Sequence, residues 1–325
     1  MLACPFRMRP DRLAPAHLLL VLLLIPAMSF AAGTDRVDVR MENVNLHVGH
    51  GVELRVLYLA GRLASAAPGK VPTFDDVNSY LIEVDSARVS MTAGSLTNLM
   101  NNVLFAGPSA PIKNVRVEIE GDEIRQTGTL TKGVSVPFTM RAALDVTSDG
   151  KLRLHPTSMK AAGIVPKGVL DFFGIHLGTL LKVRQGSGIQ VAGDDLLLDP
   201  ANVLPPPRIH GTLTKAWIAD GVLFQQFGGG KPTHSISPPV ATRNFMYYRG
   251  GTLRFGKLTM ADADLTLVDL DPKDPFDFSP AQYKDQLVAG YSKNTPGNGL
   301  VTYMPDLSDI AKRGAARQTR SKPSD

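Results

Sequence analysis

An unbroken alternation of apolar with other side chains between Val134 and Val146 constrains the fold of this chain more than any other feature. Its apolar positions are Val134, Val136, Phe138, Met140, Ala142, Leu144 and Val146. Successive side chains of a strand point to opposite faces, so this period of two predicts one long strand with a single apolar face. Asp149 and Gly150 then form a turn, and alternation resumes over 151–157, which predicts an antiparallel hairpin.

The same pattern predicts strands on both sides of this hairpin. Upstream strands are expected at 37–48, 52–63, 79–92, 115–119 and 123–132. Strand patterns resume after the LPPP segment at 204–207, first over 209–224 and then over 252–268. The sequence therefore predicts a mainly β (α+β) protein with a second β-rich half.

Two stretches depart from the strand pattern. Residues 95–105 carry apolar side chains at offsets of three and four, which predicts a helix with one apolar stripe and Ser95 as its N-cap. The stripe consists of Leu96, Leu99, Met100, Val103 and Leu104. Residues 167–183 are apolar on all sides, as expected of a helix clasped by a sheet.

The order of these elements resembles a known group of proteins. The segments concerned are SLTNLMNNVLF, IKNVRVEIEGDEIRQTGTL, VPFTMRAALDVTSDGKLRLHPTSMKAAGI and LDFFGIHLGTLL, all within 95–183. They resemble the tubular lipid-binding (TULIP-like) bacterial envelope proteins, including the LmeA-like and YceB-like families. The resemblance implies a long curved antiparallel sheet wrapped around one or two apolar helices, with an apolar groove for acyl chains.

The groove would be lined by apolar side chains of the two helices. The candidates are Leu96, Leu99, Met100, Val103, Leu104, Leu170, Phe173, Leu177 and Leu180. Leu and Met suit acyl chains because they are apolar and adaptable. The alternative is that these side chains only close a dry core.

The N-terminus predicts export. Arg7, Arg9 and Arg12 precede the apolar run 18–25, and small residues follow it, which is typical of a signal peptide cut after Ala31. An uncleaved anchor is the alternative. We therefore expect a periplasmic or secreted protein, away from ATP and nicotinamide cofactors. Because its only cysteine, Cys4, lies in this signal, the mature chain has no disulfide and no thiol nucleophile.

Four regions follow from these patterns: a signal peptide at 1–31, a TULIP-like domain at 32–205, a β-rich region at 206–305 and a disordered basic tail at 306–325. The tail cations can dock on anionic lipid, and the alternative is a solvated C-terminus. Without the signal and the tail the body is nearly neutral, so a nucleic-acid partner is not expected.

One acidic segment is a candidate metal site. Asp269, Asp271, Asp274 and Asp277 follow a predicted strand in VDLDPKDPFDF, and carboxylates are ligands for Ca²⁺. The spacing departs from an EF-hand loop, and Asp near Pro is also ordinary turn chemistry. A structural turn is therefore the alternative. His47 and His50 are expected as exposed turn histidines.

Enzyme motifs are missing from the sequence. Gly186-Ser187-Gly188 lacks the second spacing of a nucleophile elbow, and no His-Glu-x-x-His occurs. We expect a non-enzymatic envelope protein, without a resident cofactor, that binds or transfers a lipid-like ligand. The alternatives are an assembly module that docks another envelope protein and an envelope hydrolase with a dispersed site.

Overall fold

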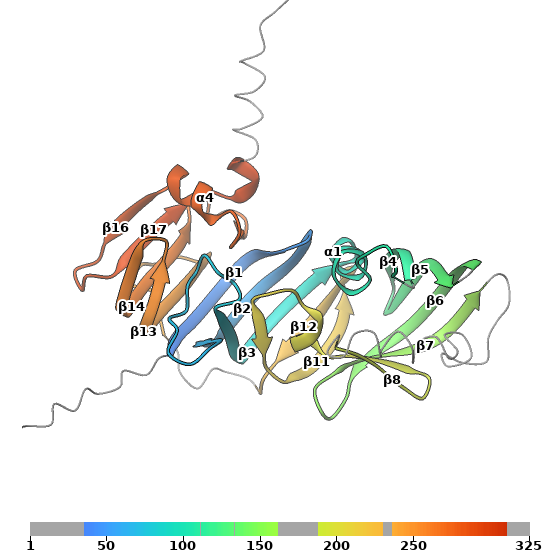
Figure 1. The fold of residues 1–325 in the computed structure, drawn as a ribbon. Helices are drawn as coiled ribbons and strands as arrows, with labels where there is room; N and C mark the ends of the chain where they lie inside the picture. The colour runs from blue at the N-terminus through green and yellow to red at the C-terminus, as the bar shows by residue number, and fades with distance from the viewer. Residues whose placement is uncertain (1–35, 111, 133, 162–187, 230–235, 311–325) are drawn as a thin grey trace, which may run out of the picture. The chain divides into compact units, whose positions relative to one another are not determined.

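The computed structural model describes residues 36–110, 112–132, 134–161, 188–229 and 236–310. Strands account for 58% of the structure and helices for 11%, which confirms the mainly β fold. The described strands form one sheet of 11 strands and one of 6, here called the larger and the smaller sheet (Figure 1). None of the described helices is long and apolar enough to cross a membrane.

The larger sheet is built around an antiparallel meander of β1 (Val37–Gly49), β2 (Val52–Ser65) and β3 (Tyr80–Thr92). Its other strands are β10 (Arg208–His210), β11 (Leu213–Ala219), β12 (Val222–Phe227), β13 (Phe245–Phe255), β14 (Leu258–Asp269), β15 (Phe276–Phe278), β16 (Tyr291–Asn294) and β17 (Leu300–Met304). The sheet order is β11-β12-β3-β2-β1-β13-β14-β17-β16, with β10 added to β3 and β15 added to β1.

The sheet branches because the meander's outer strands each have two partners. The residues of β1 from Asp38 to Glu42 pair with β13, and those from Val44 to Leu46 pair with β15. Asn43 lies between the two pairings with a φ of 59°. Asn adopts this left-handed conformation more readily than most residues, so it suits the branch point.

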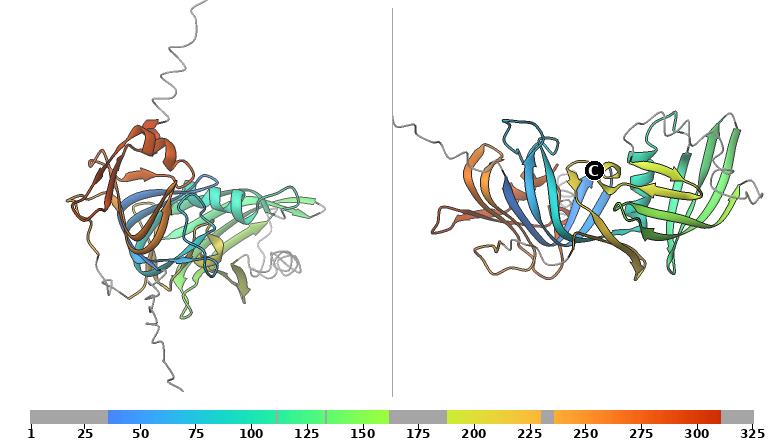
Figure 2. Two further views of the ribbon diagram at one scale, coloured as in Figure 1. Left: turned by 60° about the vertical axis from the view of Figure 1, so that its left-hand side comes forward. Right: turned by 90° about the horizontal axis from the view of Figure 1, so that it is seen from below.

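The smaller sheet consists of β4 (Ile112–Glu120), β5 (Glu123–Lys132), β6 (Val134–Val146), β7 (Leu152–Ala161), β9 (Asp195–Leu198) and β8 (Ile189–Ala192), in that order. It is curled, as Figure 2 shows for the strands drawn in green. The predicted hairpin is β6–β7, and β6 has the predicted bounds. The period of two therefore predicted this hairpin correctly.

The larger sheet collects strands from two separate parts of the chain. Strands on both sides of the LPPP segment, β1–β3 and β10–β17, share the larger sheet, whereas β4–β9 form the smaller one. The chain leaves the smaller sheet at β9 and enters the larger sheet at β10, so the LPPP segment at 204–207 lies between strands of different sheets. Alternation shows which residues are strands but carries no information on which distant strands pair, so the return of the chain to the sheet of β1–β3 is not a feature that the sequence pattern predicts.

The first predicted helix is present as α1 (Ala93–Leu99), continued by the π-helical turn η1 (Met100–Leu104). Its N-cap is Thr92 and not Ser95: the Thr92 hydroxyl accepts a hydrogen bond from Ser95 N. Ser95 is buried and bonds the backbone of Glu53 instead. The second predicted helix, 167–183, lies outside the described residues. Two further short helices are α3 (Pro200–Val203) and α4 (Tyr283–Ala289).

An aromatic cluster fixes the loop between β2 and β3 to β13 and α4. The Phe74 ring packs edge-on against Tyr248, Phe255, Phe278 and Tyr283, with centroid distances of 5.1 to 5.9 Å. Phe74 N also donates to the carbonyl of Arg254 at 2.8 Å. The loop is thus part of the core.

Candidate functional site

The apolar stripe predicted to line a groove is in α1 and η1, where most of it is buried. The buried members are Leu96, Leu99, Met100 and Leu104, and Val103 packs half-buried against them. Both a lipid groove and a dry core require this burial, so contact with a ligand stays a prediction. The remaining predicted groove residues lie outside the described residues: Leu170, Phe173, Leu177 and Leu180.

Polar side chains of this helix bond it to strand β4 of the smaller sheet on one side and to the β1–β2 turn of the larger sheet on the other. Asn101 makes two hydrogen bonds with the backbone of Val115 in β4, at 2.7 and 2.9 Å. On the other side, Asn98 and Asn102 donate to carbonyls of the β1–β2 turn at 2.7 and 2.9 Å. Each of these bonds satisfies a backbone N–H or carbonyl group that has no partner in the strand pairing. The helix therefore covers the β4 edge of the smaller sheet.

One face of the smaller sheet is apolar across β4 to β7. Its buried apolar side chains include Val115, Val117, Ile124, Phe138, Met140, Ala142, Leu152, Leu154 and Met159. One buried polar side chain, Gln126, lies among them, opposite Val117 and Met140. Half-buried Leu196 and Leu198 continue it onto β9. Among the described elements, those that pack most extensively against this sheet are α1 with η1, at β4, and β11, at β6.

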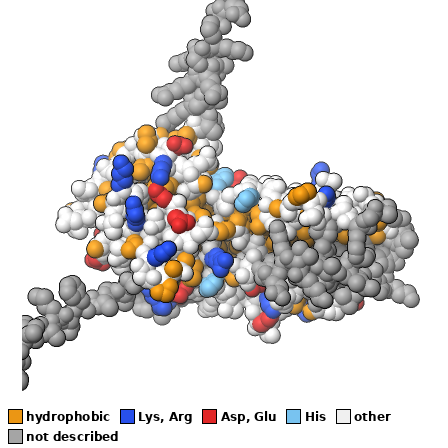
Figure 3. All heavy atoms as spheres, viewed as in Figure 1, with side chains coloured by type: hydrophobic (Ala, Val, Ile, Leu, Met, Phe, Trp, Pro, Cys, Tyr) orange, Lys and Arg blue, Asp and Glu red, His pale blue; other side chains and the backbone are white. Residues whose placement is uncertain are grey.

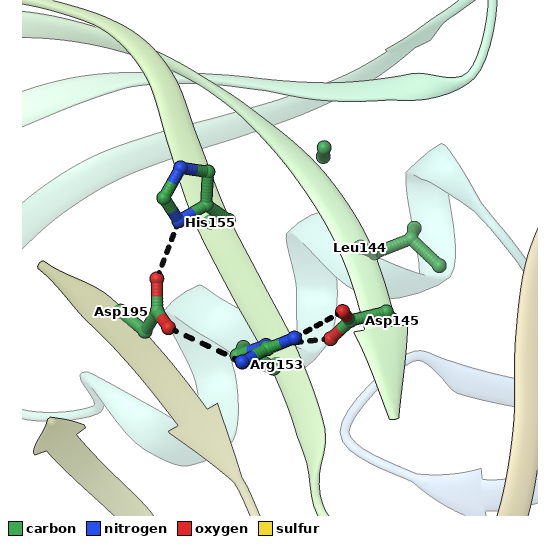
Figure 4. A pocket seen from close by; sticks show the side chains of 6 residues that line it. Leu144, Asp145, Arg153, His155 and Asp195 are labelled. Carbon is green, nitrogen blue, oxygen red and sulfur yellow. Dashed lines mark hydrogen bonds and ion pairs between the residues drawn. The ribbon is translucent and has the colours of Figure 1, made fainter. Parts of the chain in front are cut away.

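The opposite face of the smaller sheet carries charges that pair with one another. A pocket there is lined by Ala143, Leu144, Asp145, Arg153, His155 and Asp195 (Figure 4). Arg153 Nε donates to Asp145 at 2.7 Å, and His155 Nδ1 lies 2.6 Å from Asp195. None of the six lining residues is Ser, Thr, Cys or Tyr, so the His155–Asp195 pair has no nucleophile to activate in this pocket. The arrangement is a cross-strand charge ladder.

The predicted acidic segment is only partly brought together. Oxygen atoms of Asp269, Asp274 and Asp306 all lie within 4.8 Å of one another. Asp271 accepts a hydrogen bond from Lys273 N at 3.1 Å, which is turn chemistry, and Asp277 turns to other partners. Sequence reasoning missed Asp306 because it lies far along the chain, in the segment predicted as a disordered tail. Asp306 is instead buried and accepts a hydrogen bond from Asp277 N at 2.8 Å.

Burial and mutual repulsion favour protons on two of these carboxyl groups. Burial, with neighbouring aspartates, raises the pKa of Asp269 to about 6 and that of Asp306 to about 7. Neither has an ion-pair partner in the part of the chain that the structure describes. Three oxygen donors are fewer than the six to eight that Ca²⁺ takes, so other oxygens would have to complete a calcium site.

A buried asparagine ties the acidic cluster to the branch point of β1. The Asn244 side chain is 1% exposed, and its Nδ2 donates to Asp269 Oδ2 at 2.9 Å and to the carbonyl of Asp274. Its Oδ1 accepts a hydrogen bond from Asn43 Nδ2, and Asn43 in turn accepts from Arg55. In this network each side chain orients the next by a hydrogen bond, so the network favours one arrangement of the strands at the branch of the sheet.

His47 is not an exposed turn residue, contrary to expectation. It lies in β1, its Nε2 contacts Asp277 Oδ1, and its Nδ1 lies 3.6 Å from Glu53. The hydrogen bond with Asp277 raises the pKa of His47 against the opposing effect of burial. His50 does lie in the turn, as predicted, and is exposed.

No family model, curated protein or solved structure matches this chain, so the assignment of function depends on its own residues and geometry.

Proposed function

We propose that this protein is an exported cell-envelope protein that binds or transfers a lipid-like molecule along the apolar face of the smaller sheet, without covalent chemistry. The observation that carries the proposal is the one-sided apolar face of that sheet, opposite a face of paired charges. In this proposal the curled sheet wraps around apolar helices and leaves room for an acyl chain, and α1 with η1 closes the β4 end.

The energetics favour a flexible apolar ligand. Each methylene of an acyl chain that leaves water contributes about 0.8 kcal/mol, so even part of one chain gives useful affinity. Met140 and Met159 face one another across β6 and β7, and methionine adapts to ligands of irregular shape. The charged face opposite would remain in water.

The test compares two neighbouring positions of β6. Met140 is buried in the apolar face, whereas Thr139 is half-buried and points to the other face. We expect native mass spectrometry of the purified protein to show co-purified lipid, Met140→Gln to lower its occupancy severalfold, and Thr139→Gln to leave it unchanged. Circular dichroism verifies that each variant is folded, and Met159→Gln replaces Met140→Gln if the latter unfolds. A folded wild-type protein that binds neither native lipid nor an added fatty acid contradicts the proposal.

That negative result would favour the second candidate, an assembly module that docks another envelope protein. The larger sheet ends in strands β11 and β16, each with one paired neighbour on the strand path. Open strand edges are templates for pairing with another chain. Cross-linking in cells from residues of β11 or β16 would identify such a partner.

We separately propose that Asp269, Asp274 and Asp306 bind calcium. A divalent cation would replace the protons that burial favours on two of these groups. Calorimetric titration with millimolar Ca²⁺ should then release protons and heat, and Asp274→Asn should abolish both. Absence of heat from the folded protein would remove calcium from consideration.

A further inference from the structure

Aromatic and basic side chains gather on the outer face of the larger sheet, at its β11 end. This aromatic–cationic patch consists of Tyr58, Arg88, Lys215, Trp217, Phe224 and Gln226. The strand register places it across four neighbouring strands: Tyr58 is opposite Arg88, and Gln226 lies between Arg88 and Lys215.

The side chains of the patch organise one another. The rings of Trp217 and Phe224 stack with centroids 5.2 Å apart and planes 10° from parallel. The Arg88 guanidinium lies 5.8 Å from the Tyr58 centroid and 5.7 Å from that of Trp217, and Lys215 Nζ lies 5.1 Å from the Trp217 centroid. Gln226 accepts a hydrogen bond from Arg88 at 3.1 Å and donates one to the Tyr58 hydroxyl at 2.7 Å.

The cations of the patch have no anionic partner in the described residues. Arg88 and Lys215 are exposed, and neither pairs with a carboxylate of the described chain. In the next row of the sheet, Arg55 Nη1 is buried without a hydrogen-bond partner among the described atoms. The part of the surface formed by β13, β14, β16 and β17 is different, because basic and acidic side chains are interspersed there (Figure 3).

We propose that the aromatic–cationic patch docks this protein on the surface of an anionic lipid bilayer. Tryptophan and tyrosine prefer the membrane–water interface, where the ring body is apolar and its polar tip stays wet. Lysine and arginine beside them attract anionic headgroups at about 1 kcal/mol per charge. Positive charge without local carboxylates, next to half-buried aromatic rings, is complementary to that surface. This surface is distinct from the apolar face of the smaller sheet and does not depend on a ligand there.

The chain carries its own probe, because Trp217 is its only tryptophan. The full chain is mixed with phosphatidylcholine vesicles that contain or lack phosphatidylglycerol, and intrinsic fluorescence and co-sedimentation are measured. With anionic vesicles we expect a blue shift of the Trp217 emission, protection from acrylamide, and sedimentation. Neutral vesicles should produce none of these changes.

Substitutions in the patch then distinguish its contribution to vesicle binding from that of other basic segments. Arg88→Gln and Lys215→Gln should each weaken binding to anionic vesicles about fivefold. Lys293→Gln is the matched control, since Lys293 also lies over two rings, Tyr291 and Tyr303, but outside the patch. It should bind like the wild type. Every variant keeps both termini, so any contribution of the termini to vesicle binding is the same in the variants and the wild type.

Two results would overturn the proposal. Sedimentation with anionic vesicles that is unchanged by Arg88→Gln and Lys215→Gln, with no shift of Trp217 emission, would assign binding to another segment such as the basic C-terminus. Absence of any binding by the folded protein would exclude the bilayer as the partner. The variant Met140→Gln, which is expected to lose lipid from the smaller sheet, should bind anionic vesicles as the wild type does.

Discussion

His47 in β1 and Asp277 in β15 form a hydrogen-bonded pair that joins strands 230 residues apart in the sequence. Asp277 also accepts a hydrogen bond from Ser308 N at 3.1 Å, and its own N donates to Asp306. Asp306 and Ser308, in the last described segment, are thus both bonded to Asp277, which in turn contacts His47 in β1. Because one member of this arrangement is a histidine, its strength depends on pH near neutrality.

Replacing His47 by Gln should remove a stabilising contribution that is present at low pH. The pKa of His47 is raised in the folded state, so the proton is bound more tightly there. The contribution is complete below the unfolded pKa of about 6.5 and is lost as pH rises through the folded value. We expect His47→Gln to lower the free energy of unfolding by about 1–2 kcal/mol at pH 5.5 and by less at pH 9.

Urea unfolding of wild type and variant between pH 5 and 9 measures this difference. His50→Gln is the control, because His50 lies in the exposed turn and has no carboxylate partner among the described residues. Its substitution should change the free energy of unfolding by less than about 0.5 kcal/mol. A difference between wild type and His47→Gln that is equal at pH 5.5 and pH 9 would contradict the assigned pairing.

The effect of Asp306→Asn on stability should grow as pH rises, whereas the effect of His47→Gln should decline. Burial raises the pKa of Asp306 to about 7, so the charged form is disfavoured in the folded protein. Stability is therefore lost as pH rises from about 4 to about 7, and a neutral amide avoids that loss. We expect Asp306→Asn to raise the melting temperature by a few degrees at pH 8 and to leave it nearly unchanged at pH 4. Calorimetric melts at the two pH values check this, and equal shifts at both would contradict it.

Strand positions were predictable from this sequence, whereas strand partners were not. The predicted bounds of β6 agree with the structure because its alternation depends only on local residues. At the point where β1 changes from β13 to β15 as its partner, Asn43 bonds to Asn244, and this contact forms only after distant segments meet. The same limit explains why Asp306 was missed. The sequence pattern favours Ser95 as the N-cap, but Thr92, three residues earlier, has an equivalent hydroxyl, and local sequence does not rank the two.

Asn244→Ala should destabilise the branch of the larger sheet. The side chain is buried, and its removal leaves donors and acceptors of Asn43, Asp269 and Asp274 without partners. Each such group costs about 1–3 kcal/mol, so a total loss of about 2–4 kcal/mol is expected. Urea denaturation measures it. Asn78→Ala is the control, because Asn78 is exposed, and its substitution should change stability by less than about 0.5 kcal/mol.

Phe74→Ala should show that the β2–β3 loop contributes to the core of the larger sheet. Phe74 is 2% exposed and contacts four aromatic rings, so its truncation leaves a cavity that those rings fill only partly. Losses of about 3–5 kcal/mol are typical of such a change. Val71 lies in the same loop but is 38% exposed, and Val71→Ala should cost well under 1 kcal/mol. Thermal unfolding of the two variants distinguishes a packed loop from a surface one: similar small losses in both would mean that Phe74 is not held in the aromatic cluster in solution.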